Sequence, residues 1–323
     1  MENAKDILIF SDYEPDDFVA LWALHVRHAN DRVLLVITEN DGETIQRKAE
    51  DAAHFFPRFV IQRGATSTKK RVFVKNATAP DRIFPVHHEV SNPRPHVVYA
   101  LAPMRDLVNH VAVEPDFFRE SVMYAYGGFN IAEVLPMRSA DEWPRFFSHF
   151  ARVVIVETRP AFGTALTLTT SGVFLPAALD AVREDPRAAR LITMIREWNV
   201  QIRGKMLDGV AEGAVALKVK SGDAAELGYA DIDRRLAIAH GVDRDAHQMV
   251  FADPAVAVLP IVPFMEAALT PVSLAIDGNG RFRYNDDPTS TTFLLRPRRE
   301  AQCEMHNVAE AALTDLLFAK RAN

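Results

Sequence analysis

Four acidic side chains lie within six residues near the start of the chain. They are Asp12, Glu14, Asp16 and Asp17, and they follow the apolar run 7–10. Carboxylates this close repel one another, and a divalent cation relieves the repulsion. Because hard cations take oxygen ligands from carboxylates and backbone carbonyls, the turn is a candidate metal or catalytic site. The alternative is helix capping, since acids in a first helical turn are stabilised by the helix dipole and by free N–H groups. One or two acids would be fully explained by capping, but four are harder to explain in that way.

A further acid late in the chain has the same two interpretations. Asp253 precedes Pro254 and follows a short strand-like segment. An Asp-Pro pair in that place is typical of a helix start, with Asp as the N-cap and Pro at the first helical position. Taken alone, Asp253 is better explained as a helix cap than as a ligand.

The elements that must position the first acids follow an alternating pattern. The short apolar runs 7–10, 33–37 and 59–61 predict buried strands, and the apolar spacing within 18–28 and 44–56 predicts helices between them. This alternation favours a parallel sheet with helices on both faces. Ligands of such open sheets bind at the carboxyl ends of the strands, which is where the acidic turn lies.

The later part of the chain continues the alternation more loosely. The further predicted elements are strands at 96–101, 122–126 and 165–169, helices at 102–111, 143–156 and 186–206, a short strand and a helix within 250–262, a hairpin formed by 271–276 and 281–284, and a last helix at 307–319. No repeat or linker divides the chain. We therefore expect residues 1–323 to form one α/β domain with an open, mostly parallel, Rossmann-like sheet and a C-terminal hairpin and helix.

The composition argues against several classes of function. The chain has 14 glycines among 323 residues, and none of them forms a G-x-G-x-x-G or a G-x-x-x-x-G-K-[ST] loop. Nucleotide cofactors held by glycine-rich loops are therefore not expected. The net charge of −6 argues against a broad nucleic-acid interface. The single cysteine, Cys303, fits a reducing compartment, and neither a secretory signal nor a membrane-spanning apolar run is recognised. We expect a cytoplasmic protein with no membrane partner.

The first acidic segment resembles the N-terminal signature of the nucleoside hydrolase family, ribohydrolases that cleave the N-glycosidic bond of nucleosides. The family signature is D-x-D-x-G-x-D-D-A-x-A-L, and residues 10–21 are similar to it. Asp12, Asp16 and Asp17 match its last three acids, while Phe10 replaces the first.

Three later segments resemble the family in the same order along the chain. Residues 98–106 resemble a strand followed by G-P-L-T-N, and 126–128 resemble M-G-G. Asp253-Pro254 with the apolar residues after it resembles the H-D-P motif. The ordered set covers most of the chain, so the resemblance implies the α/β fold of the family.

The resemblance implies a calcium site that acts on a ribosyl ligand. Asp12, Asp17 and Asp253 would ligate Ca²⁺ together with the backbone carbonyl of Leu101. The ribose 2′- and 3′-hydroxyls would complete the coordination, and Asp16 would form a hydrogen bond with one of them. A calcium-bound water, deprotonated by Asp12, would attack C1′, which fits metal-assisted cleavage of a glycosidic bond.

Two further positions belong to the ligand site that the resemblance implies. Asn40 lies near where the family places a sugar-contacting asparagine, and a plain turn explains it equally well. Tyr126 is an aromatic side chain that could stack on the base, as are Phe129, Tyr13 and Trp143. A lone aromatic is more often part of the core. The family also implies a homodimer or homotetramer.

Several positions depart from the family pattern. Ala252 stands where many members carry a histidine that protonates the leaving base, and the segment that grips the ribose 5′ side is not recognised. Glu14, Glu39 and Ala102 replace glycines around the expected pocket, which indicates that the pocket is remodelled. Three interpretations remain open. The chain is an active calcium-dependent nucleoside or ribosyl hydrolase, a catalytically impaired relative that binds a ribosyl ligand or partner, or an aspartate-nucleophile phosphatase. The last would need D-x-D, and Glu14 interrupts that motif.

Overall fold

The structure is a computed structural model, and it describes the chain in separate segments. They are residues 4–38, 42–64, 94–102, 104–127, 142–157, 168–169, 184–194, 197, 250–251, 253–276, 282–295 and 302–318. Several residues with predicted roles lie outside these segments, namely Asn40, Phe129 and Ala252.

The centre of the fold is one open sheet that is mostly parallel. Its strands are β1 (Asp6–Ser11), β2 (Arg32–Ile37), β3 (Val60–Arg63), β4 (Val97–Ala100), β5 (Val122–Gly127), β6 (Arg152–Glu157), β9 (Leu269–Ile276), β10 (Phe282–Asp286) and β11 (Thr292–Leu295). The strand order is β10-β9-β11-β6-β5-β4-β1-β2-β3. Strand β9 runs antiparallel to both of its neighbours, and the other recorded pairs in this sheet are parallel. The predicted α/β class, the Rossmann-like sheet and the C-terminal hairpin are therefore confirmed.

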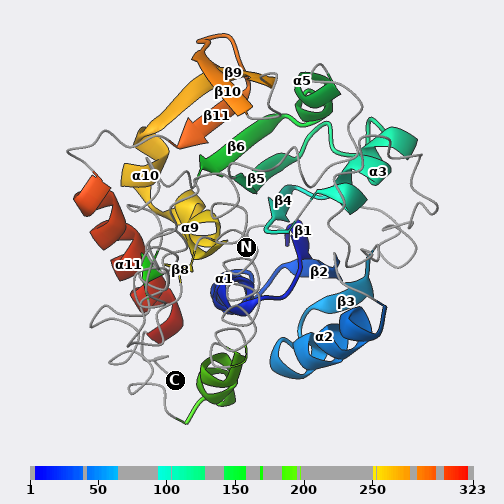
Figure 1. Cartoon of the computed structure of the whole chain (residues 1–323), viewed down its shortest axis with the longest axis vertical. Coiled ribbons are helices and arrows are strands. Elements are labelled where there is room, and N and C mark those ends of the chain that lie inside the picture. The colour runs from blue at the N-terminus through cyan, green and yellow to red at the C-terminus, as the bar shows by residue number, and fades with distance from the viewer. Residues whose placement is uncertain are drawn as a thin grey trace, which may run out of the picture.

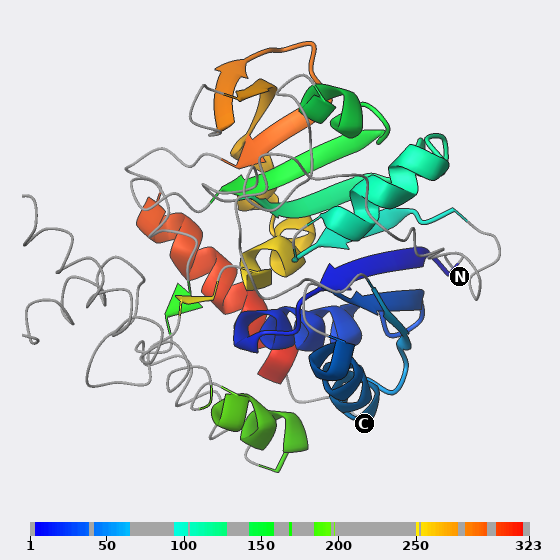
Figure 2. The same ribbon diagram turned by 45° about the vertical axis from the view of Figure 1, so that its right-hand side comes forward.

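Helices cover both faces of this sheet (Figures 1 and 2). In the described segments they include α1 (Pro15–Arg27), α2 (Gly42–Phe55), α3 (Arg105–Val113), α5 (Glu142–Phe147), α9 (Asp253–Val258), α10 (Pro263–Ala267) and α11 (Gln302–Phe318), with a 3₁₀ turn at Leu259–Ile261. Helices α1, α2, α9 and α11 pack on one face, and α3 and α5 on the other. No helix in the described segments is both long enough and apolar enough to cross a bilayer.

Strand β1 is buried along its whole length because it lies inside the sheet between β2 and β4. Ile7 and Ile9 belong to the core cluster on the α1 face, whereas Leu8 and Phe10 belong to the cluster on the α3 face. This period of two across an apolar run is what a strand covered on both faces requires. The acidic turn is therefore attached to one of the most enclosed strands of the molecule.

The predicted helix at 143–156 is wrong. Helix α5 ends at Phe147, and β6 begins at Arg152 and pairs in parallel with β5 and β11. The physical reason is the run of β-branched residues from Val153 to Val156, which lose side-chain freedom in a helix and pack well on a sheet. Strand β11 was not expected at all.

Two short strands lie outside the main sheet. β7 (Leu168–Thr169) pairs antiparallel with β8 (Val250–Phe251). The predicted helix at 186–206 is observed over 186–194, and most of the rest of that range lies outside the described segments. The last helix, α11, starts at Gln302, five residues earlier than expected.

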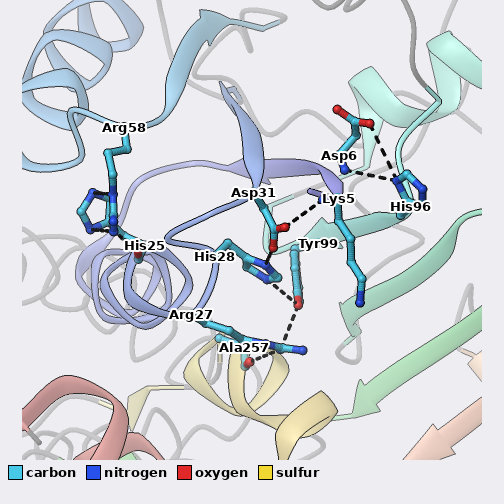
Figure 3. Close-up of polar contacts among 10 residues, drawn as sticks. All are labelled: Lys5, Asp6, His25, Arg27, His28, Asp31, Arg58, His96, Tyr99 and Ala257. Atoms are coloured by element: carbon cyan, nitrogen blue, oxygen red, sulfur yellow. Dashed lines mark hydrogen bonds and ion pairs between the residues drawn. The ribbon is translucent and has the colours of Figure 1, made fainter. Parts of the chain in front are cut away.

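A polar network joins the carboxyl end of α1 to β4 (Figure 3). His28 contacts Asp31 through Nδ1 at 2.7 Å and the Tyr99 hydroxyl through Nε2 at 3.3 Å. Arg27 Nη1 donates to the same hydroxyl at 3.0 Å. Because Tyr99 already accepts from Arg27, its own proton is directed to Nε2, so the network accommodates the neutral imidazole with a proton on Nδ1. Burial lowers the pKa of His28, which agrees with a neutral ring.

Candidate metal centre

The acidic turn occupies the topological switch point of the sheet. β1 lies between β2 and β4, so the chain leaves β1 toward one edge and later returns on its other side. Residues 12–14 connect the end of β1 at Ser11 to the start of α1 at Pro15. Helix α9 packs against α1, and this contact brings Asp253, the first residue of α9, to the turn.

Three carboxylates converge at this point. Asp16, Asp17 and Asp253 each offer an oxygen atom, and these atoms all lie within 4.8 Å of one another. Asp17 is 1% exposed and Asp253 is 3% exposed, whereas Asp16 is half-buried. The structure therefore brings together acids from opposite ends of the sequence. Asp12, which the family resemblance names as a ligand, is not part of this trio among the described residues.

The carboxylate of Asp17 is held by the turn itself. Ser11 Oγ donates to Asp17 Oδ1 at 2.6 Å, and the backbone N–H of Glu14 donates to Asp17 Oδ2 at 3.0 Å. The second contact is a helix-capping interaction, so the capping interpretation is correct for part of what Asp17 does. Both contacts fix the direction in which its remaining lone pairs point.

Asp253 is not satisfied in the same way. Its Oδ1 atom is buried and has no hydrogen-bond partner among the described residues. Buried polar atoms in native proteins are almost always paired, so an atom of this kind requires an explanation. Helix capping does not supply one for Oδ1, whereas a cation would.

The electrostatics of the site favour a bound cation. Burial raises the pKa of Asp17 well above its usual range, and the charges of Asp12, Asp253 and Asp16 raise it further. Burial also raises the pKa of Asp253, and the neighbouring charges of Asp16, Asp12 and Glu14 add to the effect. Several carboxylates in a poorly solvated site are unfavourable when ionised. A hard divalent cation matches an all-oxygen donor set, so the residues present fit a cation of this kind.

Two other predicted positions lie near the carboxyl edge of the sheet. Leu101 directly follows β4, and its N–H donates to the carbonyl of Phe10 on β1 at 3.0 Å. Tyr126 lies near the end of β5 and packs partly buried against the core cluster on the α1 face. Both therefore lie at or just after the ends of strands that finish at the same edge as the acidic turn.

Tyr13 belongs to the core rather than to an open aromatic wall. It is 2% exposed, its ring packs edge-on against Phe18, and its hydroxyl donates to Asp51 Oδ2 at 3.0 Å. Its backbone is left-handed, with φ of 55°. A residue other than glycine in that region costs of order 1–3 kcal/mol and persists only where its surroundings hold it.

The sequence did not reveal the part that α2 plays at this site. Lys48 Nζ donates to the backbone carbonyl of Asp12 at 2.6 Å, and Asp51 accepts a hydrogen bond from the Tyr13 hydroxyl. Arg190 Nε donates to Asp51 Oδ2 at 2.9 Å. The only signal in the sequence is a pair of opposite charges three residues apart on one helix, which is common on solvated surfaces.

Comparison with protein-family models and with curated protein sequences finds no match for this chain. Solved structures do match it. An inosine-guanosine nucleoside hydrolase superposes with a TM-score of 0.58 at 11% identity, covering 97% of this chain and 98% of that chain. A plant nucleoside hydrolase gives 0.56 at 14% identity, over 98% of this chain and 100% of that chain.

A purine-preferring ribonucleoside hydrolase from Gardnerella vaginalis gives a TM-score of 0.53 at 12% identity, over 98% of this chain and 100% of that chain. Each likeness covers at least 97% of this chain. At such identities they establish architecture rather than chemistry. The chain therefore has the fold of the nucleoside hydrolases.

Proposed function

We propose that this protein is a calcium-dependent N-ribohydrolase that cleaves the N-glycosidic bond of a nucleoside or a related ribosyl compound. The observation that carries the proposal is the convergence of Asp16, Asp17 and Asp253 at the switch point of a nucleoside hydrolase fold. The names of the three structural neighbours, all nucleoside hydrolases, support the same substrate class.

In this proposal Asp12, Asp17 and Asp253 hold the cation together with the backbone carbonyl of Leu101. When bound, the cation would supply Lewis acidity, which lowers the pKa of water and binds the ribose diol. The buried Oδ1 of Asp253, which has no hydrogen-bond partner in the part of the chain that the structure describes, supports this role, as does the fixed direction of the Asp17 carboxylate.

The side chains of the chain itself would perform the proton and charge steps. The half-buried Asp12 carboxylate accepts a proton from the water that attacks C1′. The C1′–N bond breaks, and its electron pair leaves with the base. Asp16 orients a ribose hydroxyl, and the negative charge of the site stabilises the oxocarbenium character that develops at C1′. Asn40 and Tyr126 complete the ligand site in this proposal.

A second candidate function is binding of a ribosyl ligand without hydrolysis. The observation that favours it is Ala252, because alanine cannot donate a proton to the departing base. Both functions predict binding of the metal and of a ribosyl ligand, but only the first predicts hydrolysis.

Release of free base from a panel of purine, pyrimidine and nicotinamide nucleosides decides between them. With calcium present we expect release from at least one nucleoside, and none after chelation. Asp17→Asn should lower the rate roughly a hundredfold or more, because it removes a ligand charge from the site.

Asp116→Asn is the matched control, because the same change is made at a side chain that is 70% exposed. It should leave the rate unaltered. Calcium and nucleoside binding without turnover would support the binding function, and absence of calcium binding would contradict the proposal.

We further propose that residues 1–323 act as one domain, which the near-complete coverage by each structural neighbour supports. The homodimer or homotetramer and the cytoplasmic location stay predictions. Light scattering on the purified protein tests the oligomeric state.

A further inference from the structure

Two side chains of α2 contact the acidic turn. Lys48 and Asp51 are three residues apart, so they lie on the same side of the helix. Lys48 Nζ donates to the Asp12 carbonyl at 2.6 Å, and Asp51 Oδ2 accepts from the Tyr13 hydroxyl at 3.0 Å. Both side chains are half-buried. Helix α2 therefore contacts the turn at two consecutive residues.

The peptide unit between Asp12 and Tyr13 is bonded at both of its polar groups. Its carbonyl accepts from Lys48, and its N–H donates to Ser11 Oγ at 2.9 Å. The same Ser11 hydroxyl donates to Asp17 Oδ1 at 2.6 Å. A continuous series of contacts thus runs from Lys48 through one peptide unit to a buried carboxylate. Because the Asp12 side chain leaves the backbone next to this peptide unit, the plane of the peptide sets the direction of that side chain.

The conformation of Tyr13 shows that the turn needs outside support. Residues other than glycine rarely adopt its φ of 55°. Such a residue keeps this conformation only where neighbouring groups hold it. The hydrogen bond to Asp51 is one of those groups. Asp51 is itself fixed by Arg190 Nε at 2.9 Å, in a pair whose side chains are 24% and 26% exposed.

We infer that Lys48 and Asp51 are positioning residues of the metal centre. By fixing the peptide between Asp12 and Tyr13, they aim the Asp12 carboxylate at the cation and at the attacking water. The inference rests on the function proposed above and adds α2 to the machinery of the site. Lys48 contributes through its hydrogen bond to the carbonyl, which is distinct from the general effect of one positive charge near several carboxylates.

Replacement of Lys48 tests this inference against a neighbouring control. Lys48→Met keeps most of the length of the side chain and removes the donor. Arg47→Met removes the same charge from the next residue of α2, which is exposed. We expect calcium affinity, measured by calorimetry, to fall about tenfold to a hundredfold in Lys48→Met, as for other residues that orient metal ligands. It should change less than about twofold in Arg47→Met, as is usual for an exposed charge.

Steady-state kinetics at saturating calcium give a second readout. A misaimed Asp12 should lower kcat more than it raises KM, because the ribose contacts of Asp16 persist. Lys48→Arg keeps a donor and should recover most of the lost kcat. A merely structural role would lower the melting temperature of the metal-free protein and leave calcium affinity and kcat unaltered.

Tyr13→Phe removes only the hydroxyl that donates to Asp51. This variant decides the question if circular dichroism shows that Lys48→Met does not fold. It should weaken calcium binding in the same direction. The inference alone is overturned if the wild-type protein binds calcium and hydrolyses nucleosides, but Lys48→Met and Tyr13→Phe have the same calcium affinity and kcat as Arg47→Met. A wild-type protein that binds no calcium overturns the proposed function, and the inference with it.

Discussion

Asp17 and Asp253 place two carboxylates in surroundings with almost no solvent, beside the charges of Asp12 and Asp16. Without a cation, this arrangement lowers the stability of the folded chain, because burial and like charge both disfavour the ionised groups. A site of this kind lowers the stability of the metal-free protein and raises its affinity for a cation. Both effects can be measured at single residues.

Asp253→Asn should make the metal-free protein more stable and abolish the stabilisation by calcium. The amide keeps the shape of the side chain but removes a buried charge, so we expect a gain of about 1 kcal/mol or more in the free energy of unfolding. Urea unfolding with calcium and with a chelator checks both effects. A variant that is less stable without metal and still stabilised by calcium would contradict this role of Asp253.

At the residue scale, the sequence predicted the acids but not what holds them. Asp12, Asp16 and Asp17 lie within six residues of the chain, so their proximity could be inferred without a structure. Asp253 could be joined to them only through a family resemblance, because its position depends on the packing of α9 against α1. Lys48 could not be predicted, since its partner is a backbone carbonyl that no sequence pattern marks.

The ends of β2 and β3 and the start of α3 meet beside the end of β1, where Thr38 donates its N–H to the Ser11 carbonyl at 3.0 Å. Thr38 Oγ1, after β2, donates to the buried carboxylate of Asp106 in α3, and Gly64, after β3, donates its N–H to the Ile37 carbonyl at 2.7 Å. Asp106 thereby ties the first turn of α3 to the end of β2. Gly64 lies against this contact and leaves no room for a side chain.

Gly64→Ala should destabilise the protein by about 1 to 3 kcal/mol, as overpacking of a filled site usually does. The added Cβ would overlap with Asp106 Oδ2 and lie 2.9 Å from Val36 Cγ1 and 3.0 Å from Thr38 Cβ. Denaturant unfolding of Gly64→Ala, Asp106→Ala and the double variant measures the coupling. The double variant should lose less than the sum of the two single losses, and strict additivity would show that the carboxylate is not the obstacle.

At the element scale, the prediction succeeded where the hydrophobic period was regular. Strands β1 and β2 are built around uninterrupted apolar runs, and the structure has them within one residue of the expected bounds. The strand β6 was missed because the aromatic residues of α5 precede it closely and merge into one apparent helix. Strand β11 pairs with β6 and β9, which are distant in the sequence, so its pairing could not be inferred locally.

At the scale of the whole molecule, a second polar centre lies at the carboxyl end of α1, whereas the acidic turn lies at the amino end of the same helix. In this second centre, His28, Asp31, Arg27 and Tyr99 hold the carboxyl end of the helix against the sheet (Figure 3). The same helix therefore bears a buried acid, Asp17, in its first turn and a buried neutral imidazole just after its end. The two centres should respond to pH in opposite directions.

His28 should make the wild-type protein less stable as the pH falls. Burial lowers its pKa in the folded chain, while the unfolded chain keeps the ordinary value of 6.5. Below that value the unfolded state binds the proton more readily, so the contribution of neutral His28 is complete above 6.5 and is lost as the pH falls beneath it. The stability difference between the wild type and His28→Gln, from urea unfolding, should therefore shrink between about pH 7.5 and pH 5.5. A difference that does not vary with pH would contradict a neutral His28.

The distance in sequence between the acidic turn and Asp253 has a consequence for how the protein is made. On the ribosome, β1 to β5 are synthesised long before α9 emerges, so the parallel core can assemble while one wall of the metal centre does not yet exist. A nascent chain that stops short of Asp253 would contain the early strands and still be unable to capture the cation. In the proposed function, uptake of the cation would thus begin only late in translation, and it would mark the chains whose synthesis has passed α9.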